Sequence, residues 1–146
     1  MNTKVMFSSN SMDWETPQWF FNKLNKEFKF TLDPCCTKKT KKCDIYFTRR
    51  QDGLQQDWGN HVVFMNPPYG REISKWIKKA YEESRKKAIV VCLVAARTET
   101  NGWWDYCRKG RIRFIRGRLK FKGKNKKGKL VNYDATFPSA VIIFKK

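Results

Sequence analysis

Residues 62–95, VVFMNPPYGREISKWIKKAYEESRKKAIVVCLVA, contain the pattern that decides the fold. The stretch opens with an apolar run, Val62–Met65, that stops at two prolines, as expected of a buried strand leaving a sheet into a rigid loop. Apolar residues then recur at helical spacing over 73–81 with lysines between them, which predicts an amphipathic helix. A second apolar run follows at 88–95. Strand, helix and strand in this order predict a right-handed parallel crossover.

The flanking sequence predicts the remaining elements. Thr16 followed by Pro17 is typical of a hydroxyl cap and a proline at the first helical position, so a helix is expected to begin there and run to about Glu27. Short strands are expected over residues 28–33, stopped by Pro34, and over 44–48. The C-terminal part predicts a short helix over 101–108, strands from about residue 111 and over 140–144, and a mobile Lys- and Gly-rich loop over 122–129.

These elements predict an α/β fold with a mostly parallel sheet and antiparallel strands at its C-terminal edge. A chain of 146 residues is long enough for one core but too short for a catalytic domain and a separate DNA-reading domain. We therefore expect one domain over residues 13–146, preceded by an irregular segment over 1–12.

The charge of the chain is strongly unbalanced. Lys and Arg number 32 against 13 Asp and Glu, which gives a net charge of +19 and indicates a polyanionic partner, with nucleic acid as the first candidate. An anionic membrane surface is the weaker alternative, because the longest apolar run is too short to span a bilayer. The sequence start has no apolar region of the kind that a secretory signal needs, so a cytoplasmic protein is expected.

The cysteines are odd in number and lack a paired C-x-x-C spacing, which favours reduced thiols over a disulfide framework. A zinc site built from Cys35, Cys36, Cys43 and His61 is disfavoured, because adjacent cysteines and a lone distant histidine are poor ligand geometry. We therefore expect no metal site.

Ligands of open α/β sheets bind beyond the carboxyl ends of the strands, so residues that follow strands are the first candidates for a site. Asp33, Asn66 and Arg97 hold such positions. The alternatives are a turn that Asp33 forms before Pro34, and a structural salt bridge for Arg97.

The loop Asn66-Pro67-Pro68-Tyr69 has a composition suited to methylating an aromatic amine. The amide oxygen of Asn66 and the carbonyl of Pro67 can accept both hydrogens of an exocyclic NH2 and turn its lone pair toward a methyl donor. Pro67 and Pro68 stiffen the loop and remove competing amide hydrogens, and Tyr69 is expected to offer a flat face on which an extruded base stacks. The alternative is an ordinary Asn-Pro turn.

The chain from about Asp13 to Phe144 resembles the phage-type DNA N-6-adenine methyltransferases, which use S-adenosylmethionine. Most of the matching stretches are weak evidence when taken singly, but their occurrence in this order is strong evidence for the resemblance. They are Trp14-Glu15-Thr16-Pro17, Leu32-Asp33-Pro34-Cys35, Asp52-Gly53-Leu54 with Asp57-Trp58, Asn66 to Gly70, Ala96-Arg97-Thr98, Arg116 to Phe121, and Phe137-Pro138-Ser139-Ala140.

The resemblance implies a Rossmann-like methyltransferase domain that methylates adenine N6 in DNA, in the host cytoplasm if a phage encodes it. It implies that Asn66, Pro67, Pro68 and Tyr69 are catalytic and base-binding. The residues implied to hold S-adenosylmethionine are Thr16, Pro17, Asp33, Pro34, Asp57 and Asn66. In one respect the chain departs from most adenine methyltransferases: Leu32-Asp33-Pro34-Cys35-Cys36 stands where a glycine-rich loop usually follows the first strand, a form that the small phage-type family tolerates. For Asp57, a solvated loop acid is the alternative.

Contact with double-stranded DNA is expected from basic residues that alternate with apolar ones late in the chain, beginning with Arg111 and Arg113, and from the loop that follows. The candidates are Arg97, Arg116, Arg118, Lys120, Lys122, Lys124, Lys126 and Lys127. The alternative is a solvated charged loop without a reading function. Trp103 and Trp104 either pack in the core, which is favoured, or stack on a base.

Two other classes of function remain open from the sequence. One is a nucleic-acid-binding protein without enzymatic activity, in which the proline loop is only a turn. The other is an amino-methyltransferase that acts on cytosine N4, on RNA or on a protein glutamine, since each of these substrates presents a planar NH2 group.

Overall fold

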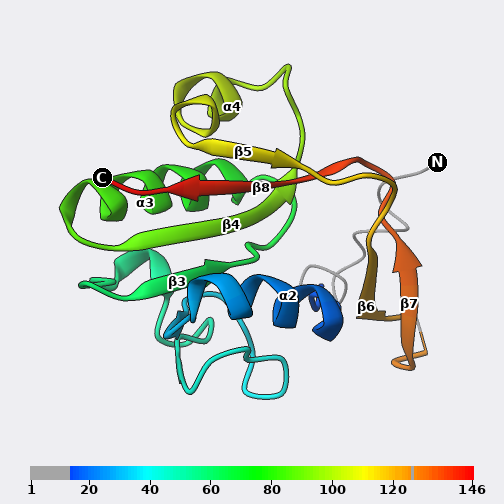
Figure 1. The fold of residues 1–146 in the computed structure, drawn as a ribbon. Helices are drawn as coiled ribbons and strands as arrows, with labels where there is room; N and C mark the ends of the chain where they lie inside the picture. Colours follow the sequence, from blue (N-terminus) through cyan, green and yellow to red (C-terminus); the bar gives the residue numbers. More distant parts are fainter. Residues whose placement is uncertain (1–13, 126) are drawn as a thin grey trace.

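The computed structural model describes residues 14–125 and 127–146, so the expected irregular segment over 1–12 and the candidate Lys126 lie outside the described residues. The main sheet has six strands in the order β2-β1-β3-β4-β8-β5 (Figure 1). Its strands are β1 (Leu32–Asp33), β2 (Ile45–Tyr46), β3 (Val62–Met65), β4 (Ile89–Ala95), β5 (Arg111–Phe114) and β8 (Ser139–Phe144).

The sheet is parallel from β2 to β4, whereas β8 runs antiparallel to both of its neighbours, β4 and β5. The predicted α/β fold with a mostly parallel sheet and antiparallel pairing at the C-terminus is confirmed. One detail differs, because β8 lies between β4 and β5 and leaves β5 at the edge.

Helices cover both faces of this sheet. They are α2 (Gln18–Phe28), α3 (Ile73–Lys86) and α4 (Asn101–Asp105), with 3-10 turns at Gly53–Gln55 and Cys107–Lys109. Phe64 of β3 packs in one apolar cluster with α2, while its neighbours Val63 and Met65 pack with α3 and α4 in the other. In the described part of the chain, no helix is long and apolar enough to cross a bilayer.

The start of α2 differs from the predicted cap. Pro17 is itself the residue before the helix, and no side chain caps the first turn. The strand expected over residues 28–33 shrinks to β1 because Phe28 still belongs to the helix and Lys29 ends it in the left-handed conformation, with φ of 57°. The hydroxyl of Thr16 is therefore available for another partner, described below.

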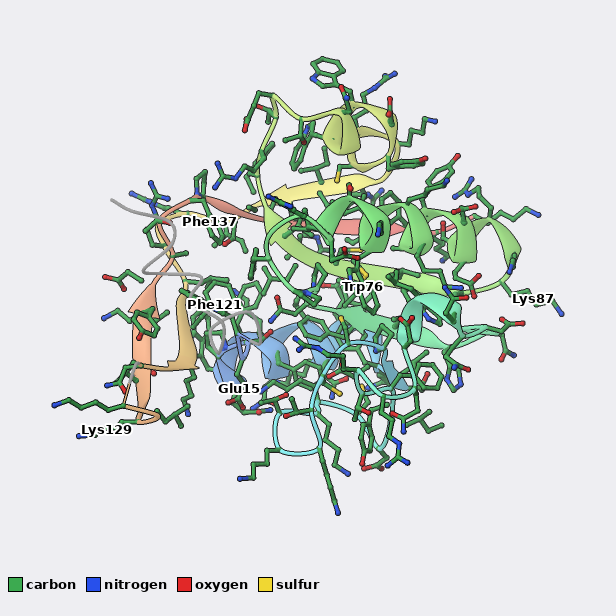
Figure 2. The ribbon with its side chains drawn as sticks, turned by 180° about the vertical axis from the view of Figure 1, so that it is seen from behind. Glu15, Trp76, Lys87, Phe121, Lys129 and Phe137 are labelled. Atoms are coloured by element: carbon green, nitrogen blue, oxygen red, sulfur yellow. The ribbon has the colours of Figure 1, made fainter. Side chains whose placement is uncertain are left out.

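The Lys- and Gly-rich segment forms part of a hairpin. Strands β6 (Lys120–Lys124) and β7 (Leu130–Asp134) pair antiparallel, so the loop predicted over 122–129 is wrong for residues 122–124. In the turn, the side-chain oxygen of Asn125 accepts hydrogen bonds from the backbone N–H groups of Lys127 and Lys129. Figure 2 shows Phe121 and Phe137 between the hairpin and the main sheet, and Lys129 at the far end of the hairpin.

Glu83 is a buried carboxylate that ties α3 to the segment before β3. Its Oε1 accepts a hydrogen bond of 2.6 Å from the backbone N–H of the fully buried Trp58, and its Oε2 lies 3.5 Å from Lys79 and 2.9 Å from Lys86. The Trp58 indole donates in turn to the carbonyl of Gly53. Because a buried N–H without an acceptor is costly, Glu83 fixes the position of the loop over 53–58.

Replacing Glu83 with Ala is expected to lower the free energy of unfolding by about 1–3 kcal/mol, because the Trp58 N–H loses its acceptor inside the protein. The measurement is urea denaturation followed by circular dichroism. Glu82 is the matched control, since it is the exposed acidic neighbour on the same helix. Glu82→Ala should change stability by less than about 0.5 kcal/mol, and equal losses in the two variants would contradict the role of Glu83.

Candidate active site

Asn66 follows β3 directly, and both hydrogens of its side-chain amide are used. Nδ2 donates to the backbone carbonyl of Trp14 at 2.6 Å and to Oγ1 of Thr16 at 3.0 Å. A carbonyl can only accept, so the atom next to Trp14 must be the NH2 group, and the orientation of the amide is determined. The amide oxygen Oδ1 is consequently the atom that remains to accept hydrogen bonds from a substrate.

The backbone of the same loop is held from the other side. The thiol of Cys35 donates to the carbonyl of Asn66 at 3.3 Å, and burial raises the pKa of this thiol well above its usual value. A protonated Cys35 is a hydrogen-bond donor and not a nucleophile.

Tyr69 does not present the open face that the sequence analysis expected. Its ring is only 3% exposed and packs against Trp14, Phe121 and Phe137 at centroid distances of 6.3, 5.9 and 5.1 Å. The Tyr69 hydroxyl donates a hydrogen bond of 3.5 Å to Oδ1 of Asn66, which keeps capacity for a second donor. The stacking expectation failed because the hairpin and the C-terminal segment, which the loop sequence does not reveal, cover the ring.

Asp33 lies beneath the loop and organises the segment after β1. Its Oδ1 accepts from the Cys35 N–H at 3.3 Å, which is the turn that the sequence analysis kept as an alternative, and its Oδ2 accepts from the Lys42 N–H at 3.0 Å. The carboxylate is 3% exposed, and this burial raises its pKa to about 6 although the two backbone donors act in the opposite direction.

A cavity of about 530 Å³ opens beside the Asn66 loop, at the carboxyl ends of β1 and β3. Its floor includes Asn66, Pro68 and Pro34, and its outer wall comes from the segments over 37–40 and 48–54. Trp76 of α3 supplies an aromatic side, visible near the centre of Figure 2. A volume of this size suits a cofactor or another small organic ligand.

The outer wall is set by Gly53. A Cβ added there would lie 2.1 Å from the carbonyl oxygen of Pro34, so only glycine allows these two loops to meet. The preceding residue, Asp52, has a φ of 55° and accepts the Leu54 N–H through its carboxylate. Close packing at Gly53 therefore places Asp52 in the cavity wall.

The cofactor-site residues implied by the resemblance are only partly brought together. Asn66 and Pro34 line the main cavity, and Thr16, Asp33 and Asn66 line a small adjoining pocket of about 20 Å³. Pro17 lines neither of these pockets, and Asp57 is an exposed residue whose carboxylate accepts the Gly59 N–H at 2.7 Å. The Gly59 N–H and the nearby Lys86 and Lys79 lower the pKa of Asp57.

Sequence reasoning missed most of the outer wall. The charged residues that line the cavity and were not predicted are Lys38, Arg49, Arg50, Asp52 and Glu72. A signal existed for Asp52 alone, because Asp52-Gly53-Leu54 is one of the stretches that carry the family resemblance. Trp76 was assigned to the buried face of its helix, and it belongs both to the core and to the cavity.

The predicted DNA-contacting residues lie in the hairpin or in the segment that leads into it from β5, except Arg97, which follows β4. Arg116, Arg118, Lys120, Lys122 and Lys127 are exposed. Arg97 is also exposed, and its guanidinium lies 5.7 Å from the centroid of the Phe137 ring. The backbone of Lys124 belongs to β6. Within the described ranges, no three His, Cys, Asp or Glu residues are grouped as they would be around a metal ion.

The fold and the loop together define the class of protein. A Rossmann-like sheet with an Asn-Pro-Pro-Tyr loop at the carboxyl end of a central strand, beside a cofactor-sized cavity, is the arrangement of a methyltransferase domain. The chain matches the family described as DNA N-6-adenine-methyltransferase (Dam) over residues 4–146, and it belongs to that family.

Two curated relatives agree with this assignment. The DNA N-6-adenine-methyltransferase of Haemophilus phage HP1 (strain HP1c1) is 30% identical over 110 residues, which cover 73% of this chain and 63% of the relative. The DNA N-6-adenine-methyltransferase of Escherichia phage T1 is 28% identical over 144 residues, which cover 81% of this chain and 60% of the relative. The chain thus spans somewhat under two thirds of the length of these relatives.

The raised pKa of Asp33 predicts a measurable pH dependence of stability. Between the ordinary value of 3.8 and about 6, the folded state binds more protons at this carboxyl than the unfolded state does, so the free energy of unfolding falls as the pH rises through this window. At about 1.4 kcal/mol per pKa unit, the fall approaches about 3 kcal/mol.

Asp33→Asn removes this titration. The free energies of unfolding of wild type and variant are measured by urea denaturation at pH values from 3.5 to 7. As the pH rises to about 6, the value for wild type should fall relative to that for the variant, and above this pH the difference should be constant. Parallel profiles of the two proteins across that range would show that Asp33 is not a buried titrating group.

Proposed function

We propose that the chain transfers a methyl group from S-adenosylmethionine to the N6 atom of adenine in DNA. The observation that carries the proposal is the fixed amide of Asn66, whose two hydrogens are bound by Trp14 and Thr16. Family membership and the methyltransferase names of the relatives support it.

The geometry suits a reaction at an exocyclic amine. The lone pair of an adenine amino group is delocalised into the ring, so the nitrogen is a poor nucleophile until both of its hydrogens are held. Oδ1 of Asn66 and the carbonyl of Pro67 are two acceptors on adjacent residues of one rigid loop. Holding the NH2 group between them aligns the nitrogen for attack, and alignment of this kind can supply about 7 kcal/mol or more toward the barrier.

The residues around the main cavity fit S-adenosylmethionine by their chemistry. The cofactor supplies an electrophilic methyl group on a sulfonium, and its other groups are an adenine, a ribose, an α-ammonium and a carboxylate. Trp76 and Leu54 suit the adenine, Asp52 suits the ribose hydroxyls, and the cations Lys38 and Arg50 suit the carboxylate. The Asp33 carboxylate beneath the pocket favours the positive groups.

Thr16 and Tyr69 are assigned as positioning residues for the same loop. Thr16 is buried and its hydroxyl accepts from Asn66, and Tyr69 packs the loop against the aromatic cluster at the base of the hairpin. Double-stranded DNA is the proposed substrate, bound by the basic residues of the hairpin and by Arg97, because neutralising phosphates is the main source of affinity for a protein with this charge.

Asn66→Ala is expected to abolish transfer of label from tritiated S-adenosylmethionine to unmethylated duplex DNA, read as N6-methyladenine after nucleoside digestion. Thr16→Val should lower kcat about five- to tenfold, because one of the two acceptors that orient the Asn66 amide is lost. Thr16→Ser keeps the hydroxyl and should stay near the wild-type rate.

The position of the label distinguishes this proposal from its competitors. Label on cytosine N4, on RNA or on protein would replace adenine N6 as the target, and tight DNA binding without any label or cofactor binding would indicate a binding protein without enzymatic activity. A Thr16→Val rate equal to that of wild type would remove the positioning role while leaving the reaction in place.

The charge of the hairpin predicts a change in the salt dependence of DNA binding. The double variant Lys122→Ala with Lys127→Ala should reduce the slope of log K against log salt concentration by about 1.8, if each lysine neutralises one phosphate. The matched control is Lys87→Ala with Lys146→Ala, which removes the same charge at the opposite end of the sheet, where Lys87 lies in Figure 2. Equal slopes for the two double variants would contradict hairpin contact with DNA.

A further inference from the structure

Two large aromatic side chains stand exposed beside the proposed active site. Phe114, the last residue of β5, is 69% exposed, and Trp104 of α4 is 58% exposed. Strands β4 and β5 both pair antiparallel with β8, so they run in the same direction. Phe114 therefore lies at the end of the sheet where β4 also has its carboxyl end. A single exposed apolar side chain is common on protein surfaces, so the significance of these two rests on how they are held and on what surrounds them.

These side chains are held in place. The ring of the buried Trp103 stacks on Phe114 with centroids 6.3 Å apart and planes 27° apart. The indole of Trp104 donates to the carbonyl of Thr98 at 2.8 Å, and Arg108 donates to the carbonyl of Trp104 at 2.6 Å while its guanidinium lies 5.6 Å from the indole centroid. A fixed aromatic surface loses little side-chain entropy on binding a ligand.

The surroundings are basic. Residues 97–118 contain seven Lys and Arg residues and two acids, Glu99 and Asp105. Arg113 is paired through two hydrogen bonds of 2.8 and 2.6 Å with Glu27, and Arg97, Arg108 and Arg116 are exposed. The aromatic surface is therefore complementary to a polyanion and not to a neutral apolar partner.

The surface is also linked to the loop of Asn66. The guanidinium of Arg97 lies over the ring of Phe137, and that ring packs 5.1 Å from Tyr69. Arg97 follows β4 and precedes α4, so the connection that bears Arg97 leads from the neighbourhood of Asn66 to Trp104.

We propose that Phe114 and Trp104, with Arg108, form a stacking surface for DNA bases that lose their stacking partners when the target adenine leaves the helix. This inference rests on the proposed function. Phosphate contact needs only cations, whereas aromatic rings next to arginines are the combination that binds unpaired bases without regard to sequence. Extruding a base for reaction exposes such faces in the strand that remains.

The test compares two labelled duplexes by fluorescence anisotropy, one fully paired and one with a single unpaired adenine, in the wild-type protein and in Phe114→Ala and Trp104→Ala. Each variant should bind the duplex with the unpaired adenine at least about fivefold more weakly than wild type and should retain the wild-type slope of affinity against salt, because stacking releases no counterions. Ile45→Ala is the matched control, since Ile45 is 50% exposed on β2 at the other edge of the sheet, and its affinities should stay within about twofold.

A milder variant, Phe114→Leu, separates loss of stacking from loss of folding, because it keeps an apolar side chain at the edge strand and should show the same defect with an unchanged thermal transition. Wild-type affinities in all the aromatic variants, or a loss shared equally by both duplexes, would overturn the proposal. Binding is read without methyl transfer, so an active enzyme with unaffected variants rejects the stacking surface alone, and a protein that stacks bases but transfers no label rejects the proposed function alone.

Discussion

The site depends on one interaction, the pair of hydrogen bonds from the Asn66 amide to the segment of Trp14 and Thr16. These residues are 52 and 50 positions away in the sequence, so the orientation of the Asn66 amide depends on a distant segment as well as on Tyr69 of its own loop. Rotation of an asparagine side chain by 180° exchanges its amide oxygen and NH2 group at little cost, unless the oxygen has a donor and the NH2 group has acceptors. Two acceptors on one segment orient the NH2 group toward Trp14 and Thr16 and turn Oδ1 to the other side, where the Tyr69 hydroxyl is its donor and where the proposed amine substrate would be a second one.

The segment that holds Asn66 is itself held by three parts of the chain. Glu15 exchanges two backbone hydrogen bonds with Lys122 of the hairpin, and its carboxylate lies 3.3 Å from Lys42, whose own backbone N–H is bound by Asp33. The proposed DNA-binding hairpin, the floor of the proposed cofactor pocket and the Asn66 loop therefore meet at residues 14–16. Because each of these contacts is direct, a displacement of the hairpin would shift the Asn66 side chain through residues 14–16.

The sequence predicted the elements whose signal is local. The strand, helix and strand over residues 62–95 follow from hydrophobic periodicity, although β4 begins one residue later than the predicted run and α3 continues five residues beyond the apolar pattern over 73–81. Strand β7 gave no such signal, since Leu130 is exposed and Tyr133 packs across the hairpin against Trp14. Thr16 was predicted to cap α2 because a hydroxyl at that position favours a helix start locally. In the structure this hydroxyl instead accepts a hydrogen bond from the distant Asn66.

The site shows the same division between local and tertiary signals. Asp33 and Asn66 could be predicted because any residue that follows a parallel strand reaches the ligand edge, whereas the wall around Asp52 depends on a contact between two loops. That contact lies next to the segment after β1, where a glycine-rich loop is absent. Pro34 and Cys35 make the floor there, and the close backbone approach is provided by Gly53, where any side chain would collide with the Pro34 carbonyl. This contact joins residues 34 and 53, so a motif search confined to the segment after β1 cannot find the wall that it creates.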